Sequence, residues 1–265
     1  SGVRATLTYL HKRNDGYVDN SYTRDSRDPG ANRTDAARIA LAFDNSGPFR
    51  AHYSYDYNRN KGYPAAFQLT AVRADFPAFF AGSPAAGGGT LTYSPDRLDK
   101  IALDQNGAVI DTVQAHTLTL ELDLGENTTL KSLTGYRKWR QNVTSSDQDG
   151  NGGLLGPIVG GGTALHPINL FGSSALRHQH QWSEELNLIG KLGDSLDYVL
   201  GAYYSIEKSD ETNPQSFAAV TPRGAVSRAS LFRYKHESST KALFAQATWH
   251  ATDRLNMTGG LRYTW

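Results

Sequence analysis

From residue 49 the chain reads Phe49-Arg50-Ala51-His52-Tyr53-Ser54-Tyr55-Asp56-Tyr57-Asn58, in which apolar or aromatic residues alternate with polar ones. Successive side chains of a β-strand point to opposite faces, so a two-residue repeat predicts a strand with one apolar and one polar face. The odd-numbered residues of this stretch would share the apolar face. An amphipathic strand is therefore the element from which the fold is built.

The same repeat recurs along most of the chain and predicts about nine antiparallel strands. The other apolar positions are Val3, Ala5, Leu7 and Tyr9; Ile39, Leu41 and Phe43; Leu118, Leu120, Leu122 and Leu124; Trp182, Leu186 and Leu188; Leu196, Tyr198, Leu200, Ala202, Tyr204 and Ile206; Leu243, Ala245, Ala247 and Trp249; and Leu255, Met257, Leu261 and Tyr263. A further strand, from Thr128 to about Val143, alternates poorly, and its faces cannot be assigned. One short helix is expected at Ser94–Lys100, because Ser94-Pro95-Asp96 resembles a helix N-terminus.

Short and long connections alternate between these strands. Gly, Asn, Asp and Ser, the residues of tight hairpins, form short turns at 44–47, 125–127, 193–195 and 251–253. Long polar segments lie between them at about 13–33, 60–108, 144–177 and 208–238. Outer-membrane barrels have short periplasmic turns and long extracellular loops, so the alternation favours such a barrel, with the short turns facing the periplasm.

Composition excludes several other classes of protein. The 27 Lys and Arg residues balance 26 Asp and Glu residues, for a net charge of +1, which does not indicate a nucleic-acid partner. The chain has no cysteine, so disulfides and thiolate metal sites are excluded. No stretch approaches the roughly 18 apolar residues of a transmembrane helix. Because the chain starts Ser1-Gly2-Val3 without a signal peptide, we expect the native N-terminus to lie elsewhere.

A soluble sandwich and a membrane barrel share this alternation, and strand length and aromatic placement separate them. The runs 110–124 and 178–192 exceed the roughly 5–6 residues of an ordinary strand. Aromatic residues are expected to form two girdles at the bilayer interfaces, as in membrane barrels. The predicted girdle residues are Phe43, Phe49 and Trp249 beside the short turns, and Tyr9, Tyr57, Trp182 and Tyr204 toward the long loops.

Several strands resemble those of TonB-dependent outer-membrane receptors. The resemblance is carried by Thr129-Leu130-Lys131-Ser132-Leu133-Thr134-Gly135-Tyr136-Arg137, by Gln181-Trp182-Ser183-Glu184-Glu185-Leu186-Asn187-Leu188, and by the stretches 9–17, 196–204, 243–249 and 255–263. It implies an all-β transmembrane barrel and energised uptake of a scarce ligand: a ferric siderophore, cobalamin or an oligosaccharide. It also implies a location in the outer membrane of a Gram-negative bacterium, and no catalysis or cofactor.

The family pattern includes an N-terminal plug, which contacts the TonB complex, inside a barrel of about 22 strands. We therefore expect residues 1–265 to be part of the barrel, without the plug or the barrel C-terminus. The expected partners are outer-membrane lipid, a small molecule or metal chelate, and the TonB complex through the plug. The complete protein is expected to be a monomer. Polar-face charges are predicted to line the lumen or face the plug: Arg50, Asp56, Glu121, Asp123, Glu185 and Arg262.

Candidate ligand-binding residues are Arg140, Arg177, His178, His180, Tyr63 and Phe67. The two histidines, two residues apart on a strand, would share a face that is able to hold a metal or an iron chelate. Tyr63 and Phe67 would offer aromatic contacts from a long loop.

The run Asp147-Gln148-Asp149-Gly150-Asn151-Gly152 resembles the start of a calcium loop, but Ile158 occupies the twelfth position, where such a loop has Glu. A polar loop apex is expected there, and no metal site. Neither a Ser-His-Asp order nor a carboxylate pair suited to acid–base chemistry stands out.

Three other functions remain open: a passive porin, an outer-membrane enzyme and a soluble carbohydrate-binding β-sandwich. A plug encoded upstream would distinguish a receptor from a porin, and clustered catalytic residues would indicate an enzyme.

Overall fold

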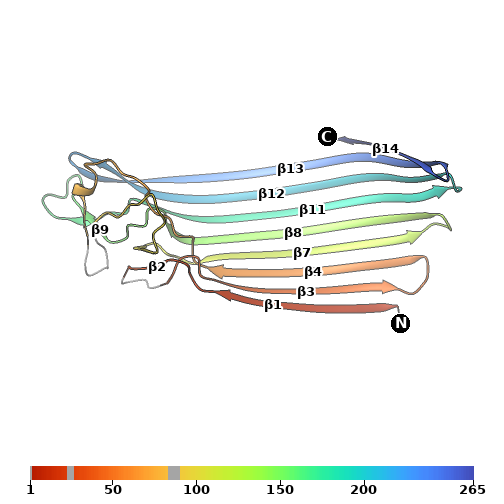
Figure 1. The fold of residues 1–265 in the computed structure, drawn as a ribbon, viewed down its shortest axis with the longest axis horizontal. Helices are drawn as coiled ribbons and strands as arrows, with labels where there is room; N and C mark the ends of the chain where they lie inside the picture. The colour runs from red at the N-terminus through yellow and green to blue at the C-terminus, as the bar shows by residue number, and fades with distance from the viewer. Residues whose placement is uncertain (1, 23–26, 83–89) are drawn as a thin grey trace.

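Nine long strands, each paired with the next along the chain, form one antiparallel sheet. The structure is a computed structural model that describes residues 2–22, 27–82 and 90–265. The strands follow the order β1-β3-β4-β7-β8-β11-β12-β13-β14 across the sheet (Figure 1). Their bounds are β1 Val3–Asn14, β3 Asn32–Asp44, β4 Phe49–Gly62, β7 Val109–Asp123, β8 Thr128–Asp147, β11 Phe171–Leu192, β12 Leu196–Thr221, β13 Gly224–Thr252 and β14 Leu255–Thr264. The predicted all-β architecture of about nine strands is confirmed.

The four short turns lie together at one end of the sheet, as predicted (Figure 1). Side chains hold the first of them: Asp44 Oδ1 accepts a hydrogen bond from the Ser46 N–H (3.0 Å), and Asn45 Oδ1 accepts one from the Gly47 N–H (3.1 Å). Ser46 adopts a φ of 63°, a value that tight turns require. The two ends of the sheet therefore differ in structure, because the long connections gather at the other end.

Most of the small elements belong to a loop cap, which we define as the described residues of the connections 15–31, 63–108 and 148–170. Here β2 (Asp19–Asn20) pairs with β6 (Lys100–Ile101), while β10 (His166–Pro167), β9 (Leu154–Gly156) and β5 (Ala81–Gly82) form a small sheet. A 3₁₀ turn, η1, covers Pro77–Phe79. Apart from Ala175 and Ala242 in the large sheet, the buried apolar residues of the described chain lie in the cap or at the hairpin tip that packs against it.

The helix predicted at Ser94–Lys100 is wrong, since the described chain forms bends there before β6. Gln68 occupies the backbone groups that a helix would use. Its Nε2 donates to the carbonyl oxygens of Ser94 and Asp96 (2.9 Å each), and its Oε1 accepts from the Leu98 N–H (2.9 Å). A distant side chain thus overrides the local preference for a helix.

The segment 208–238 was predicted to be a long connection, and this is also wrong. Strands β12 and β13 stay paired as far as Thr221 and Gly224, so only Pro222 and Arg223 turn the chain. Ladder hydrogen bonds join backbone atoms, so polar side chains do not prevent a strand from continuing. The result is a tall hairpin whose tip packs on the cap, where the Val159 N–H donates to the Ala225 carbonyl (3.1 Å).

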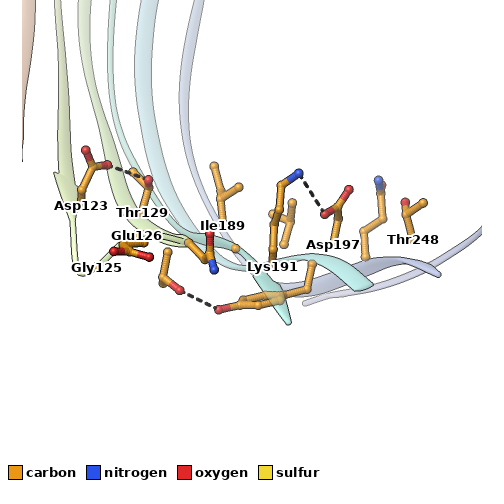
Figure 2. A pocket seen from close by; sticks show the side chains of 14 residues that line it. Asp123, Gly125, Glu126, Thr129, Ile189, Lys191, Asp197 and Thr248 are labelled. Carbon is orange, nitrogen blue, oxygen red and sulfur yellow. Dashed lines mark hydrogen bonds and ion pairs between the residues drawn. The ribbon is translucent and has the colours of Figure 1, made fainter. Parts of the chain in front are cut away.

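The sheet is curved, and its two faces differ in polarity. Figure 2 shows Asp123, Lys191 and Asp197 on the concave side. Cross-strand partners share a face, so the register extends this assignment to Arg50, Glu121 and Lys131. The predicted apolar positions lie on the convex face, where Leu7 is 74% exposed and Leu261 is 78% exposed.

These rows are not buried between two packed sheets anywhere in residues 2–22, 27–82 and 90–265, so the arrangement is not that of a soluble sandwich. The same described residues hold no helix that combines the length and apolar character needed to cross a bilayer.

Strand β8 alternates poorly in sequence because its two faces are chemically mixed. Its convex face carries Ser132 and Thr134, whose hydroxyls donate to Glu184 at 2.6 Å each. Its concave face carries Leu133 and Trp139, the indole of which donates to Asp111 (3.2 Å). Only the register with β7 and β11 assigns these faces.

The hairpin tip gives a test of the fold. Gly224 has a φ of 130°, and a Cβ there would lie 2.7 Å from the carbonyl carbon of Ile158. We expect Gly224→Ala to weaken docking of the tip by roughly 1–3 kcal/mol, because L-residues avoid this backbone conformation. Hydrogen exchange of the Val159 amide in the full-length protein measures the loss. Gly125→Ala is the control, since open space surrounds that position. If the Val159 amide were equally protected from exchange in both variants, the close contact between Gly224 and Ile158 would be contradicted.

Candidate functional site

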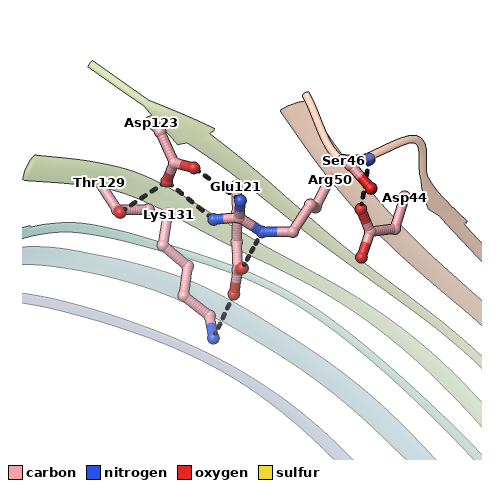
Figure 3. Close-up of polar contacts among 7 residues, drawn as sticks. All are labelled: Asp44, Ser46, Arg50, Glu121, Asp123, Thr129 and Lys131. Atoms are coloured by element: carbon pink, nitrogen blue, oxygen red, sulfur yellow. Dashed lines mark hydrogen bonds and ion pairs between the residues drawn. The ribbon is translucent and has the colours of Figure 1, made fainter. Parts of the chain in front are cut away.

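The concave face carries a network of charges beside the short turns (Figure 3). Both terminal nitrogens of Arg50 bind Asp123, at 2.6 and 2.8 Å, and its Nε donates to Glu121 at 3.2 Å. Lys131 Nζ lies 2.9 Å from the second oxygen of Glu121, and the Thr129 hydroxyl donates to Asp123 (2.8 Å). A two-oxygen contact between arginine and a carboxylate is among the stronger polar contacts in proteins and fixes orientation as well as distance.

The strand register explains why these side chains meet. Arg50 on β4 is the cross-strand partner of Glu121 on β7, which is the partner of Lys131 on β8. All three therefore point to one face at nearly one height. Their side chains are about a third exposed (28% to 32%), so each charge keeps contact with water as well as with its partner. The network therefore holds charges of both signs in one row of the concave face.

An open hollow of about 480 Å³ continues this polar surface across three hairpins (Figure 2). Its wall includes Asp123 and Thr129 from the β7–β8 hairpin, and Lys191 and Asp197 from the β11–β12 hairpin. Lys191 Nζ lies 3.6 Å from Asp197, which also accepts a hydrogen bond from His250 (3.0 Å). The hollow offers fixed charges of both signs to a polar or protein surface.

Sequence reasoning had assigned Arg50, Glu121 and Asp123 to an inward polar face, and the structure joins them in one network. It missed Lys131 because β8 does not alternate clearly. Lys191 and Asp197 were missed because they flank a turn, where the alternation stops. The available signal was the opposite charge of residues on either side of the turn at 193–195.

Three buried side chains, Asp147 at the end of β8 and Asp149 and Asn151 in the loop cap, tie the cap connections together. Asp147 Oδ1 accepts hydrogen bonds from the backbone N–H groups of Asp149 (3.0 Å) and Gly150 (2.9 Å). Asp149 Oδ2 accepts one from the Phe171 N–H (2.8 Å), and Asn151 Oδ1 accepts one from the Thr92 N–H (2.6 Å). The polar loop apex expected from the sequence is therefore buried, and its side-chain oxygen atoms accept hydrogen bonds from backbone N–H groups. We call Asp147, Asp149 and Asn151 the acidic staple.

Burial also changes the acidity of this staple, which lies where β8 enters the loop cap. Burial, followed by the charge of Asp149, raises the pKa of Asp147 to about 7. Burial raises the pKa of Asp149 to about 6, and it also raises the pKa of Asp104, which lies close by. Within the described residues, no group of three or more acidic or histidine side chains is arranged to hold a metal ion.

The predicted ligand-binding residues on β8 and β11 lie on opposite faces of the sheet. Arg177 is on the concave face, where its guanidinium contacts Gln141 and lies 2.8 Å from Glu211. Arg140, His178 and His180 are on the convex face, where Arg140 and His178 are cross-strand partners. The thickness of the sheet therefore separates Arg177 from the other three.

The other two candidates lie in the cap. Tyr63 is packed under the guanidinium of Arg27, at 4.9 Å from the ring centroid. Phe67 is 47% exposed on the surface of the cap. Tyr63 and Phe67 thus lie together in the loop cap, whereas Arg177 lies on the concave face of β11.

The predicted aromatic girdle residues all lie on the convex face. Phe43 and Phe49 meet beside the first short turn with ring centroids 6.1 Å apart. Trp182 and Tyr204 meet farther along the sheet at 5.8 Å. Trp249 is 53% exposed beside the last short turn. The other two girdle residues, Tyr9 and Tyr57, flank Ala37 on neighbouring strands. Contact of these rings with a bilayer stays a prediction.

Comparison with known proteins gives one family and several similar structures. Residues 56–265 match the family model described as TonB dependent receptor-like, beta-barrel. No curated protein sequence matches the chain.

The chain is similar to the ferric yersiniabactin uptake receptor FyuA from Yersinia pestis, with 16% identity and a TM-score of 0.64 over 99% of this chain and 34% of that one. It is also similar to the siderophore receptor PiuA from Acinetobacter baumannii, with 15% identity and a TM-score of 0.56 over 100% of this chain and 42% of that one. A third similar structure is the open form of the ferric-catecholate import receptor Fiu from E. coli K12. It has 15% sequence identity and a TM-score of 0.56 over 99% of this chain and 40% of that one. At these identities the likeness shows the fold alone, and the chain spans 34% to 42% of those proteins.

The acidic staple predicts a pH dependence of the loop cap. Because the pKa of Asp147 is raised from 3.8 to about 7, its stabilising contribution is complete below about pH 4 and is lost as the pH rises to about 7. We expect the amides of Asp149 and Gly150 to show higher hydrogen-exchange protection factors at pH 5 than at pH 8 in the full-length protein. Asp147→Asn should flatten this difference, because it removes one titrating group.

The matched control is Asp96→Asn, which changes an exposed carboxylate of the same cap and should leave the pH dependence in place. A protection pattern that rises with pH, or that is unchanged by Asp147→Asn, would contradict the proposed role of the staple.

Proposed function

Because the chain belongs to the TonB dependent receptor-like, beta-barrel family, we propose that it forms part of the wall of an outer-membrane receptor that takes up a scarce ligand. Two observations together support this proposal. Residues 56–265 match the family model, and the sheet that they help to form has one apolar and one polar face. In a membrane barrel the apolar face contacts lipid and the polar face lines a wet interior. The convex face would contact lipid, and the concave face would line the barrel.

The difference between the two ends of the sheet supports an orientation across the membrane. Short turns suit the periplasmic side, and the loop cap with the tall β12–β13 hairpin suits the outside. The convex band between them is largely apolar, apart from a polar row around Glu184, and it carries the predicted girdle aromatics toward each end. A ligand from the medium would therefore reach the cap first and the concave charge network last.

The concave charge network suits a protein partner inside the barrel. Arg50 and Lys131 face Glu121 and Asp123 in a fixed array, and the adjoining hollow is lined by charges of both signs. A plug that carries complementary charges would find pre-oriented partners there, at the end of the wall nearest the periplasm. We propose that uptake is coupled to the TonB complex through a plug of this kind.

For the ligand, we propose a metal chelate of the siderophore class. The similar proteins named above are described as receptors for ferric yersiniabactin, siderophores and ferric catecholates. On this chain, Tyr63 and Phe67 in the cap and Arg177 on the concave face are the proposed contacts. An arginine suits the anionic oxygen atoms of such a chelate, and aromatic rings suit its planar groups.

An uptake assay tests the proposal. The full-length receptor would be produced in a strain that lacks its own ferric siderophore receptors, and growth on defined ferric siderophores would be measured under iron limitation, with and without TonB. We expect growth that requires both the receptor and TonB. Equal growth without TonB would indicate a passive porin instead, and no uptake of any ferric siderophore would overturn the ligand class.

A variant tests the concave arginine. Arg177→Ala should raise the ligand concentration for half-maximal uptake roughly tenfold or more, because it removes a charged hydrogen-bond donor from the proposed path. Leu176→Ala is the matched control, since Leu176 is the neighbouring residue on the convex face. Equal half-maximal concentrations for the two variants would exclude Arg177 from the path.

A further inference from the structure

A single row of polar side chains crosses the concave face near the loop cap. Asp111 on β7, two residues after the strand begins at Val109, is the cross-strand partner of Gln141 on β8. Gln141 is the partner of Arg177 on β11, and Arg177 is the partner of Glu211 on β12. Cross-strand partners share a face, so these side chains lie at nearly one height. We call Asp111, Gln141, Arg177 and Glu211 the upper polar row.

Hydrogen-bond donors and acceptors alternate along this row. Gln141 Nε2 donates to Asp111 Oδ1 (2.9 Å), and the guanidinium of Arg177 donates to Gln141 Oε1. Another nitrogen of the same guanidinium lies 2.8 Å from Glu211 Oε1. The row therefore holds one permanent cation between two carboxylates, of which Glu211 is in direct contact with it.

The charge of Arg177 is compensated locally by Glu211. The next partners at the two ends of the row, Asn60 on β4 and Tyr234 on β13, are uncharged. Uncharged residues also occupy the same face two positions away on β11 and β12; they are Ala175, Gln179, Ser209 and Asn213. The side chains of Arg177 and Glu211 are 32% and 31% exposed. A ligand that reaches this part of the wall therefore meets one cation and one anion side by side.

This pairing distinguishes chelates by their pattern of charge. Arginine has more N–H donors than the contacts with Gln141 and Glu211 use, so the anionic oxygen atoms of a chelate can accept hydrogen bonds from Arg177. The adjacent carboxylate of Glu211 repels further negative charge and attracts an ammonium group or another N–H donor. A zwitterionic or cationic chelate satisfies both side chains, whereas a multiply anionic chelate satisfies only one.

We propose that Glu211 is a specificity-determining residue, which selects chelates that carry an ammonium group or another N–H donor beside their anionic oxygen atoms. Chelates of high negative charge are disfavoured. The inference rests on the proposed function, because it assumes that a metal chelate moves along the concave face. It narrows the proposed ligand class to siderophore-type chelates of neutral or positive net charge.

Binding of two chelates of opposite charge tests the proposal. The full-length receptor in detergent would be titrated by isothermal titration calorimetry with a ferric tris-hydroxamate that carries an ammonium tail, and with a multiply anionic ferric tris-catecholate. The wild-type receptor should bind the hydroxamate more tightly. In Glu211→Gln the ratio of the two dissociation constants should shift toward the catecholate by roughly tenfold or more, because the substitution removes a like charge from the site.

Asp210→Asn is the matched control. It removes a carboxylate from the neighbouring position of β12 on the convex face, where Asp210 is the cross-strand partner of His178. The ratio should stay within about twofold of the wild-type value, because the sheet separates this residue from the upper polar row. The charge-preserving variant Glu211→Asp should keep the preference for the hydroxamate.

Salt concentration separates a charge effect from a structural one. The catecholate affinity gained in Glu211→Gln should be lost again as salt is added, because an unopposed Arg177 attracts anions and salt screens that attraction. A substitution that merely misplaced Arg177 would weaken both chelates by a similar factor at every salt concentration.

An unchanged ratio in Glu211→Gln, or equal weakening of both chelates, would overturn the proposal. Tighter binding of the catecholate by the wild-type receptor, or binding of neither chelate, would overturn it as well. Failure of the proposed function would look different. A receptor with TonB-dependent uptake of ferric siderophores, and with a chelate preference that does not depend on Glu211, would refute this inference alone. A receptor that supports no such uptake, but in which Glu211→Gln still shifts the binding ratio, would refute the uptake proposal alone.

Discussion

Continuous backbone pairing is the constraint on which this structure depends. From Val3 to Thr264, neighbouring strands of the large sheet keep an antiparallel register, with irregularities only near Ser173–Ala175 and His250–Thr252. A slip of one residue would move every side chain of a strand to the other face. The register therefore decides which side chains lie on the apolar convex face and which lie on the polar concave face. It also places Arg50, Glu121 and Lys131 in one row.

The two ends of the sheet are stabilised by different interactions. At the short-turn end, the stabilising interactions are tight hairpins and charge pairs on the concave face. At the other end the connections are long, and the described parts of the cap are held by side chains that accept backbone hydrogen bonds, such as Asp147 and Asn151. Small apolar clusters around Leu154 and Ile101 support this cap. This division suits the proposed receptor, whose loops would recognise a ligand while regular strands form its wall.

The opposite faces of β11 show how one strand can serve two environments. Arg177 contacts Glu211 and Gln141 on the concave side, while His178 and His180 join a basic surface on the convex side. Neighbouring residues in the sequence therefore belong to different chemical settings. Grouping residues by sequence proximity assigned all three to one site, but alternation along a strand separates them.

By itself the sequence determined the strands, the short turns, the polarity of most strand faces and the difference between the two ends, because a two-residue repeat and tight-turn chemistry are local properties of the chain. Tertiary structure alone decided the faces of β8, the height of the β12–β13 hairpin and the replacement of the expected helix at 94–100 by bends around Gln68. It also decided which charges meet on the concave wall. These features depend on pairing between residues far apart in the chain, and such pairing leaves no periodic signal in either partner.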